Sequence, residues 1–393
     1  MRPRVVSVLR WLLLTIAIVL LVAGLFTAFP APAGLNWEYR VLIAGVVGEK
    51  GYRFLVLPIL LAIAGLALPD RSSRVSIATF GCAVAALTLG CKPMLQAWAL
   101  GQVLPERLAS SFGPGDAQRA PFSFRTLYAP LPPPVPSFDG TYRAGRGLEF
   151  LRAVGRSPAP CVISLHGGGW FGKGFHDRRP FNQWLARHGY AVAAIAYSVL
   201  PDARWPEPRD DVMAAITMLR AHATELGIDP SQIILLGRSA GAQLALATAF
   251  AAHDPGIKGV IAFYPPTDLR ALWQSAPAND RINGYTARQI LELMFGGTPD
   301  KAPASYDSGS ALVLADRQSP PTLLIHGALD SLVPLAQSDE LAAKLTLLHR
   351  PNELVVIPWA SHGFDTVNFD GPGGQISTYA VAQFLSAVTR QRP

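Results

Sequence analysis

The sequence is poor in charged residues and in cysteine. Only 16% of its 393 residues are charged, against roughly 25% in soluble domains, and 50% are hydrophobic. This balance indicates that part of the chain lies in lipid. The three cysteines show neither the spacing of a metal site nor that of a disulfide framework, and we expect no metal and no organic cofactor.

The charges that are present leave a formal net charge of +7. A basic chain can bind nucleic acid, but the arginines here are scattered, without a Lys/Arg run or an interleaved stripe of aromatic residues. We therefore expect no nucleic-acid partner, and we assign the excess positive charge to the surface and to membrane-flanking positions.

Long apolar runs occupy the amino-terminal third: Trp11–Phe29, Phe54–Leu68 and Val75–Cys91, and the third run can continue past Lys92 and Pro93 to about Leu104. The first run has nineteen residues, enough to cross a bilayer core as a helix. A pair of buried soluble helices is the alternative for the second and third runs, but their position behind the first run favours the membrane. Residues 1–105 are therefore predicted to form a transmembrane anchor, of three helices, with the lipid bilayer as a partner.

The charges around these runs predict their orientation. Arg2, Arg4 and Arg10 precede the first run with no acidic residue, which favours a cytoplasmic amino terminus. Three spans that start inside end outside. The segment 31–33, Ala-Pro-Ala, resembles a signal-peptidase site, and cleavage there would leave two spans with the same outcome. We expect a multi-pass protein of the cytoplasmic membrane whose remaining chain is extracytoplasmic.

The composition changes after the apolar third. Residues 106–136 are rich in proline, glycine and serine, which is typical of a semi-rigid linker. Over residues 137–393, short apolar runs alternate with helical patterns, which predicts an α/β domain with a mostly parallel sheet covered by helices on both faces. The predicted strands are Leu148–Val154, Cys161–Leu165, Ala191–Tyr197, Ile233–Leu236, Gly259–Tyr264, Thr322–Ile325 and Leu354–Ile357. The predicted helices are Phe181–Arg187, Asp210–Leu226, Ala240–Ala252, Leu335–Leu348 and Ile376–Val388.

A Gly-x-Ser-x-Gly motif joins one predicted strand to one predicted helix. Ser239 stands between Gly237 and Gly241, after Ile233–Leu236 and before Ala240–Ala252. A strand that turns sharply into a helix leaves little room at the corner. Glycines on either side let neighbouring backbone approach, and the serine points out above the sheet. An ordinary strand–turn–helix corner is the alternative for this motif alone.

A glycine-rich loop follows the predicted strand Cys161–Leu165. Its three consecutive glycines, between His166 and Trp170, can turn backbone N–H groups toward one point, as an oxyanion requires. A phosphate-binding loop is the alternative, but the spacing of Gly-x-Gly-x-x-Gly or of a Walker lysine is missing. We expect His166 to hold the loop by hydrogen bonding and not to act as the catalytic base.

Asp330 and His362 follow the predicted strands Thr322–Ile325 and Leu354–Ile357. Each has an ordinary explanation when taken alone: a turn or N-cap aspartate, and a solvated loop histidine. The chain order Ser239, Asp330, His362, with each residue after a strand of one sheet, is that of a nucleophile, an acid and a base. We therefore predict that these three residues form a catalytic triad.

These motifs resemble those of the α/β-hydrolase fold, and within it those of hormone-sensitive-lipase-like and feruloyl-esterase-like carboxylesterases. The resemblance implies that Gly168, Gly169 and Ala240 donate the oxyanion-hole N–H groups and that Thr267–Ser319 forms a small cap. Arg238 departs from the pattern, because many lipase-like relatives carry an acidic residue there. The motifs that carry the resemblance are His166–Trp170, Tyr197–Pro201, Gly237–Gly241, Gly327–Asp330 with Val333-Pro334, and His362–Phe364.

The predicted function is hydrolysis of a small-molecule carboxylic ester through an acyl-enzyme. A prolyl-oligopeptidase-like peptidase shares the triad order but usually brings a propeller, which has no counterpart in these 393 residues. A non-catalytic membrane-tethered module usually loses a triad residue, whereas this chain keeps all three. The substrate-binding residues stay open. Apolar residues of the cap segment that suit an acyl or aryl pocket are Trp273, Ile290, Leu291, Leu293, Met294 and Phe295.

Overall fold

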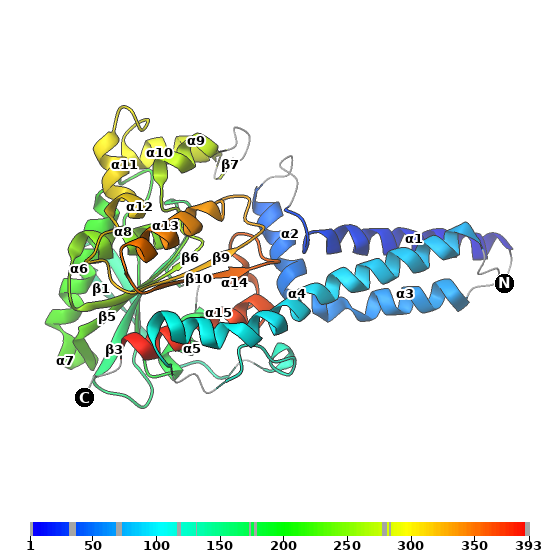
Figure 1. Ribbon diagram of the computed structural model, residues 1–393, viewed down its shortest axis with the longest axis horizontal. Helices are drawn as coiled ribbons and strands as arrows, with labels where there is room; N and C mark the ends of the chain where they lie inside the picture. The colour runs from blue at the N-terminus through cyan, green and yellow to red at the C-terminus, as the bar shows by residue number, and fades with distance from the viewer. Residues whose placement is uncertain are drawn as a thin grey trace.

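The computed structural model describes residues 3–30, 37–67, 73–115, 119–130, 132–172, 174–176, 179–276, 281–282 and 284–389. Figure 1 shows an α/β domain and a narrow bundle of long helices that extends away from it. The chain begins in the bundle, and the later two thirds form the α/β domain.

An eight-stranded sheet forms the centre of the α/β domain. Its strand order is β1-β2-β4-β3-β5-β6-β9-β10. Strand β2 runs antiparallel to both of its neighbours, and all neighbouring pairs from β4 to β10 are parallel. The predicted mostly parallel sheet is therefore confirmed. The strands are β1 (Ser137–Arg143), β2 (Arg146–Leu151), β3 (Ala159–Leu165), β4 (Ala191–Ile195), β5 (Ile228–Arg238), β6 (Ile257–Phe263), β9 (Thr322–Gly327) and β10 (Asn352–Ile357).

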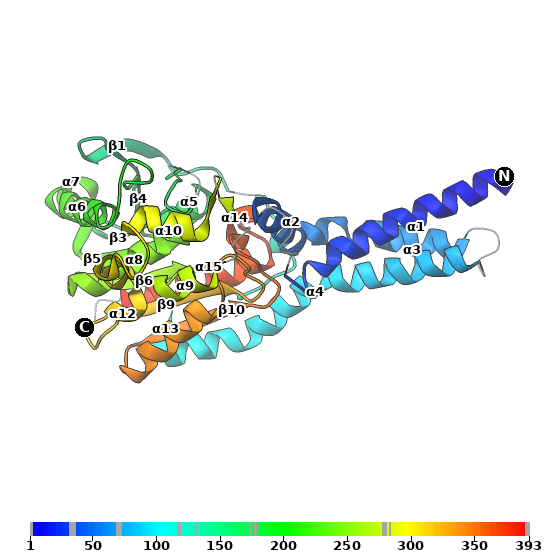
Figure 2. The ribbon, with the colours of Figure 1, turned by 90° about the horizontal axis from the view of Figure 1, so that it is seen from above.

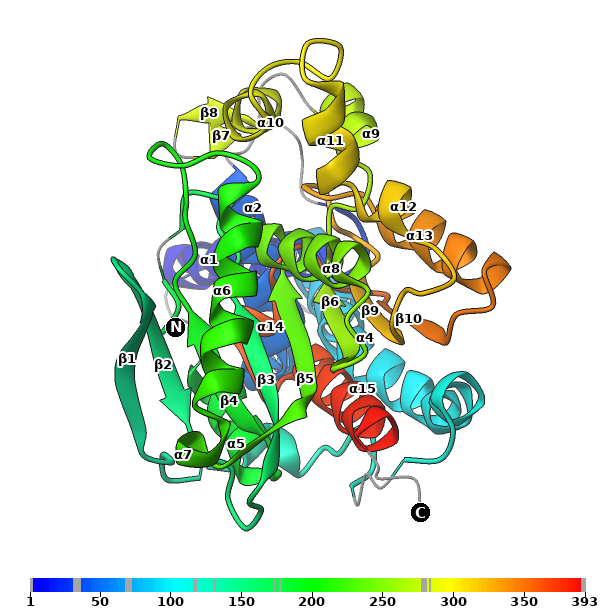
Figure 3. The same cartoon turned by 90° about the vertical axis from the view of Figure 1, so that its left-hand side faces the viewer.

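Helices cover both faces of this sheet (Figure 3). Along β3, Cys161 and Ile163 belong to the apolar core on one face, whereas Val162 belongs to the core on the other. Because both faces are buried, the central strands are continuous apolar runs in the sequence. The first face packs against α6 (Glu207–Ala221), α7 (Ala223–Leu226), α8 (Ala240–Ala252) and α13 (Ala336–Leu347), and the second against α5 (Arg179–Arg187) and α15 (Pro372–Val388).

Some element boundaries differ from the predicted ones. The predicted strand Leu148–Val154 is β2, which ends at Leu151, and the predicted helix Asp210–Leu226 is divided into α6 and α7. Strand β1 was not predicted. Tyr142 is its only buried side chain, so this edge strand has no apolar run or alternation for sequence reasoning to detect.

The amino-terminal helices α1 (Pro3–Leu25) and α3 (Val56–Ala67) lie beside the first half of α4 (Arg74–Phe112) in the extended bundle (Figures 1 and 2). Helix α1 and helix α4 are each long and apolar enough to cross a membrane. A third candidate is a pair of segments, 41–54 and 56–67, bent by 60° at the break between them. Large apolar side chains are exposed on the bundle, including Val8, Trp11, Leu12, Val19, Leu60 and Ile63.

Helix α4 is longer than the third predicted run and joins the bundle to the α/β domain. It continues past Cys91 to Phe112. Near its end, Arg107 forms an ion pair with Glu353 of β10, and the Ser111 hydroxyl donates to the same carboxylate at 2.7 Å. The helix thereby covers an edge strand of the sheet. The predicted boundary at residue 105 falls inside α4, and the division into anchor, linker and catalytic domain stays a prediction.

Candidate active site

Ser239 occupies a strained turn between β5 and α8. Its φ of 53° and ψ of −121° lie in a region that residues with a side chain rarely adopt. A Cβ at Gly237 would lie 2.1 Å from the carbonyl oxygen of Gly241, and one at Gly241 would lie 2.3 Å from that of His166. Neither position has room for a side chain, so the turn itself requires the Gly-x-Ser-x-Gly pattern.

The three residues predicted as a triad lie together at one edge of the sheet. His362 Nε2 lies 3.0 Å from Ser239 Oγ, and His362 Nδ1 lies 2.7 Å from Asp330 Oδ2. Each residue follows the carboxyl end of a parallel strand, β5 for Ser239, β9 for Asp330 and β10 for His362, so their positions converge. In this geometry the imidazole can accept the serine proton while the carboxylate holds its other N–H group.

Hydrogen bonds fix the carboxylate of Asp330 from several directions. Its Oδ1 accepts from the N–H groups of Leu332 and Val333, each at 2.9 Å, and its Oδ2 also lies 3.3 Å from Nε2 of His326. Burial alone would raise the pKa of Asp330, but the charge of His362 and the hydrogen bonds from both histidines outweigh burial and hold the pKa below its usual range. Asp330 is therefore a carboxylate at neutral pH.

The glycine-rich loop after β3 lies against the turn of Ser239. A Cβ at Gly167 would lie 3.0 Å from the carbonyl oxygen of Arg238 and 3.4 Å from the Cβ of Ser239. Gly168 and Gly169 have φ values of 118° and 58°, which glycine adopts without steric cost. The loop can follow this close path because it carries no side chains at these positions.

His166 contacts this loop through a hydrogen bond and packs against Tyr197. The residue is buried, its Nδ1 lies 2.8 Å from the carbonyl oxygen of Gly167, and its ring stacks on that of Tyr197 at 4.3 Å between centroids. The Tyr197 hydroxyl donates to the carbonyl oxygen of His166 at 2.7 Å. His166 thus has the supporting position that the sequence led us to expect.

A small cap formed by the segment between β6 and β9 lies above the site, at the top of Figure 3. Beneath it a cavity of about 40 Å³ is lined by Ser239, Gly169, Ile282, Ile290 and Leu291, among others. Ile290 and Leu291 were among the cap residues proposed for a pocket. The cap consists of α9 (Leu269–Ser275), β7 (Arg281–Ile282), β8 (Tyr285–Thr286), α10 (Ala287–Phe295), α11 (Pro303–Gly309) and α12 (Ala311–Leu314).

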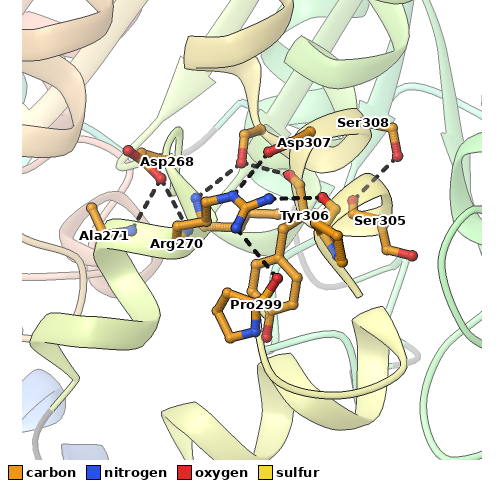
Figure 4. Close-up of polar contacts among 11 residues, drawn as sticks. Asp268, Arg270, Ala271, Pro299, Ser305, Tyr306, Asp307 and Ser308 are labelled. Carbon is orange, nitrogen blue, oxygen red and sulfur yellow. Dashed lines mark hydrogen bonds and ion pairs between the residues drawn. The ribbon is translucent and has the colours of Figure 1, made fainter. Parts of the chain in front are cut away.

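Polar contacts around Arg270 hold the cap together (Figure 4). Its Nε donates to Oδ1 of Asp307 at 2.9 Å, and its Nη1 donates to the carbonyl oxygen of Pro299 at 3.3 Å. Asp268 caps α9 by accepting from the N–H groups of Arg270 and Ala271. These bonds join α9 to α11 and to the loop before it.

A larger hollow of about 910 Å³ lies at the opposite edge of the sheet. Ile257, Pro321 and Pro351 line it, next to the starts of β6, β9 and β10, whereas the triad lies beyond the ends of the strands. The small cavity is therefore the candidate site. Across the described part of the chain, no three His, Cys, Asp or Glu side chains are grouped so that they could hold a metal ion.

Comparisons with known proteins agree with this architecture. Residues 150–345, close to half of the chain, match the family model BD-FAE. Esterase LipC of Mycobacterium tuberculosis (strain ATCC 25618 / H37Rv) is 30% identical over 251 residues, which cover 60% of each chain. The probable carboxylic ester hydrolase LipM of the same strain is 28% identical over 244 residues, which cover 58% of this chain and 54% of LipM. The chain thus spans less than two thirds of the length of these curated relatives.

A solved structure described as a bacterial heroin esterase is similar over nearly its whole length. It has a TM-score of 0.57 and 24% identity, and the match covers 75% of this chain and 98% of that chain. The chain has the α/β-hydrolase fold. The fold that the sequence resemblance implied is confirmed, and the α/β-hydrolase region has its sequence relatives among proteins named as esterases.

Two buried residues of this α/β-hydrolase site were not given roles from the sequence. His326 has Nδ1 2.7 Å from the Ser338 hydroxyl and Nε2 2.9 Å from the carbonyl oxygen of Val333. Its only sequence signal was its position four residues before Asp330. Asp365 pairs with Arg238, and 127 residues separate the two in the sequence, so no local pattern connects them.

Proposed function

We propose that the protein is a carboxylic ester hydrolase that works through a covalent acyl-enzyme. The 3.0 Å between Ser239 Oγ and His362 Nε2 carries the proposal, because nucleophilic catalysis needs a hydroxyl within hydrogen-bond reach of a general base. The sequence likeness to proteins named as esterases supports the same reaction class.

In the proposed mechanism Ser239 Oγ attacks the ester carbonyl carbon while neutral His362 takes the hydroxyl proton. Asp330 keeps the imidazole in the tautomer with its proton on Nδ1 and stabilises the imidazolium that forms. The tetrahedral intermediate then expels the alcohol, which receives the proton from His362. A water molecule, deprotonated by the same imidazole, hydrolyses the acyl-enzyme and restores the Ser239 hydroxyl.

We assign the oxyanion hole to the backbone N–H groups of Gly168, Gly169 and Ala240. Two observations support this assignment. The glycine loop lies against the Ser239 turn, and Ala240 is the first residue of α8, where helical N–H groups have no partner within the helix. The positive end of the helix dipole also favours negative charge there.

The substrate in this proposal is a small-molecule ester with a short acyl group. The cavity next to Ser239 has a volume of only about 40 Å³, and its lining is largely apolar. An acetyl or propionyl group suits such a space better than a long acyl chain does.

We also propose that residues 1–105 anchor the chain in the cytoplasmic membrane, with residues 106–136 as a linker and 137–393 as the extracytoplasmic catalytic domain. The spans would be α1, α3 and the first half of α4. The exposed apolar side chains of the bundle support this proposal, because a surface of this kind is costly in water.

A screen of p-nitrophenyl esters of graded acyl length, run beside peptide substrates, tests the proposed activity. We expect hydrolysis of the short esters by the purified protein and none by Ser239→Ala. Cleavage of peptides without cleavage of esters would favour the prolyl-oligopeptidase-like alternative. Activity on neither substrate class would favour a non-catalytic binding module.

A further inference from the structure

The amino-terminal helix α2 (Trp37–Lys50) lies against the segment that carries His362. Figure 1 shows α2 between the bundle and the α/β domain, beside α14 (Phe364–Val367). Its neighbours in sequence are α1 and α3, both of which belong to the bundle. Helix α2 therefore connects the proposed membrane anchor directly to the part of the catalytic domain that follows β10.

One face of α2 is shaped for this contact. Val41 lies 3.5 Å from the position that a Cβ would take at Gly363, the residue after His362. A Cβ at Gly45 would lie 2.7 Å from Cγ2 of Val367, so a side chain there would force the two helices apart. A Cβ at Gly48, one turn later, would lie 3.2 Å from Cδ1 of Trp359. Helical spacing puts all these positions on one side of α2.

Glu49 on the same face forms the polar part of the contact. Its side chain is fully buried, and its two carboxylate oxygens accept hydrogen bonds from different segments. Oε1 accepts from Trp359 Nε1 at 3.0 Å, and Oε2 accepts from the backbone N–H of Gly373 at 2.9 Å. Trp359 lies three residues before His362, and Gly373 lies in the first turn of α15, where backbone N–H groups have no acceptor within the helix. One carboxylate thus ties together the two ends of the segment that contains the histidine.

The glycines at the start of α15 leave room for this carboxylate. A Cβ at Gly371 would lie 2.4 Å from Oε2 of Glu49, and a Cβ at Gly373 would lie 2.6 Å from Oε1. Asn368 adds a hydrogen bond from its Nδ2 to the backbone oxygen of Glu49 at 2.9 Å. The Gly-Pro-Gly-Gly sequence at 371–374 lies outside the triad motifs. Its glycines provide the space that the Glu49 side chain occupies.

The loop that carries His362 is held on its other side by the loop of Asp330. The N–H group of Leu329 donates to the carbonyl oxygen of Ala360 at 2.9 Å, and a Cβ at Gly327 would lie 2.4 Å from that same oxygen. The histidine loop is therefore packed between the Asp330 loop and α2. Without α2, the support on that side of the loop would be missing.

We infer that Glu49 is a positioning residue for His362, so that the amino-terminal segment completes the active site as well as anchoring the chain. This inference rests on the proposed function, in which His362 is the general base. Glu49 does not line the cavity beside Ser239. Its loss should therefore lower kcat, through a misplaced imidazole, and leave KM nearly unchanged. A displacement of about 1 Å in a catalytic group can cost on the order of a hundredfold in rate.

The test compares three single variants and one double variant of the full-length protein purified in detergent. Glu49→Ala removes both acceptors, and Trp359→Phe removes the indole N–H together with part of the buried ring while it keeps an aromatic side chain. Leu42→Ala, at a position of α2 that is 54% exposed, is the matched control. Turnover is normalised to the number of serines that react with a fluorophosphonate, so that misfolded molecules do not count.

We expect kcat per reactive serine to fall by about ten- to a hundredfold in Glu49→Ala and by a smaller factor in Trp359→Phe. KM should stay within about twofold in both, and the control should match the wild type. Both changes remove the hydrogen bond between Trp359 and Glu49. Trp359→Phe should therefore lower kcat by a smaller factor in the Glu49→Ala background than in the wild type. If Glu49→Ala does not fold, the kcat and KM of Trp359→Phe decide the question.

Unchanged kcat per reactive serine in the folded variants would overturn this inference and leave the proposed function intact. A change confined to the number of reactive serines would also overturn it, because it would show a purely structural contribution. Failure of the proposed function is a different result, in which the wild-type protein itself neither hydrolyses esters nor reacts with the fluorophosphonate.

Discussion

Arg238 and Asp365 form a buried ion pair directly before the turn that presents Ser239. The Nε of Arg238 lies 2.5 Å from Oδ2 of Asp365, and the two side chains are 1% and 3% exposed. The guanidinium also lies over the rings of Phe181 and Phe263, 4.6 and 4.7 Å from their centroids. Arg238, which departs from the family pattern, is therefore part of the support beneath the nucleophile turn.

Removing the carboxylate of this pair should destabilise the fold strongly. Asp365→Ala leaves the Arg238 charge buried without its carboxylate partner, and we expect a loss of about 3–5 kcal/mol in the free energy of unfolding. Chemical denaturation in detergent measures this loss. Asp339→Ala, on the exposed surface of α13, is the control and should change stability by less than about 0.5 kcal/mol. Equal stabilities of the two variants would contradict the assigned contribution of the pair.

The lowered pKa of Asp330 predicts how stability depends on pH. An aspartate in an unfolded chain has a pKa of about 3.9, and the folded value here lies below that. The carboxylate therefore contributes stability that is present above about pH 4 and is lost as the pH falls toward the folded pKa. Between about pH 5 and 3 we expect the free energy of unfolding to fall more steeply for the wild type than for Asp330→Asn. If the free energy of unfolding fell with pH equally in the wild type and in Asp330→Asn, the pKa of Asp330 would not be lowered in the folded protein.

Enlarging the cavity should change the preference for acyl length. Ile290→Ala removes a side chain from the cavity lining beside Ser239. We expect the ratio of kcat/KM for p-nitrophenyl hexanoate to that for the acetate to rise by about tenfold, because a few methylene groups gain burial. Leu293→Ala on the same helix, which does not line the cavity, should leave the ratio unchanged. A wild-type preference for long acyl chains would contradict the small pocket.

Reporter fusions test the proposed orientation in the membrane. An alkaline phosphatase fused after Pro136 should be active, and a β-galactosidase fused at the same position should be inactive. The critical element is α3, whose 12 residues span only about 18 Å as a helix, less than the roughly 30 Å of a bilayer core. If α3 does not cross, the number of spans changes and the opposite pattern of reporter activity would result.

The sequence could predict the α/β-hydrolase fold because its main features have local signals. Buried parallel strands are continuous apolar runs, and the nucleophile turn needs glycines at fixed positions around Ser239. The same reasoning placed Asp330 and His362 after strands, where parallel topology brings residues to one edge of the sheet. Their catalytic roles stay predictions until they are measured.

Contacts between distant segments could not be predicted in this way. Neither the pairing of Arg238 with Asp365 nor the packing of Glu49 against Trp359 has a periodic or spacing signal, since each depends on how separate elements dock. The same limit applies to α4. Its apolar first half indicated a span, but the contacts of Arg107 and Ser111 with Glu353 show that the helix continues onto the α/β domain. Sequence patterns therefore identified the candidate catalytic residues but not the residues that hold them in position.

The central claim is that Ser239 is a nucleophile activated by His362 and Asp330, and covalent labelling tests it most directly. The purified protein is treated with a fluorophosphonate, and the modified peptide is identified by mass spectrometry beside assays of ester turnover. We expect a single adduct on Ser239, no adduct in Ser239→Ala with turnover about a million-fold lower, and turnover about ten-thousand-fold lower in Asp330→Asn. An adduct on another residue, or substantial turnover by Ser239→Ala, would contradict the account.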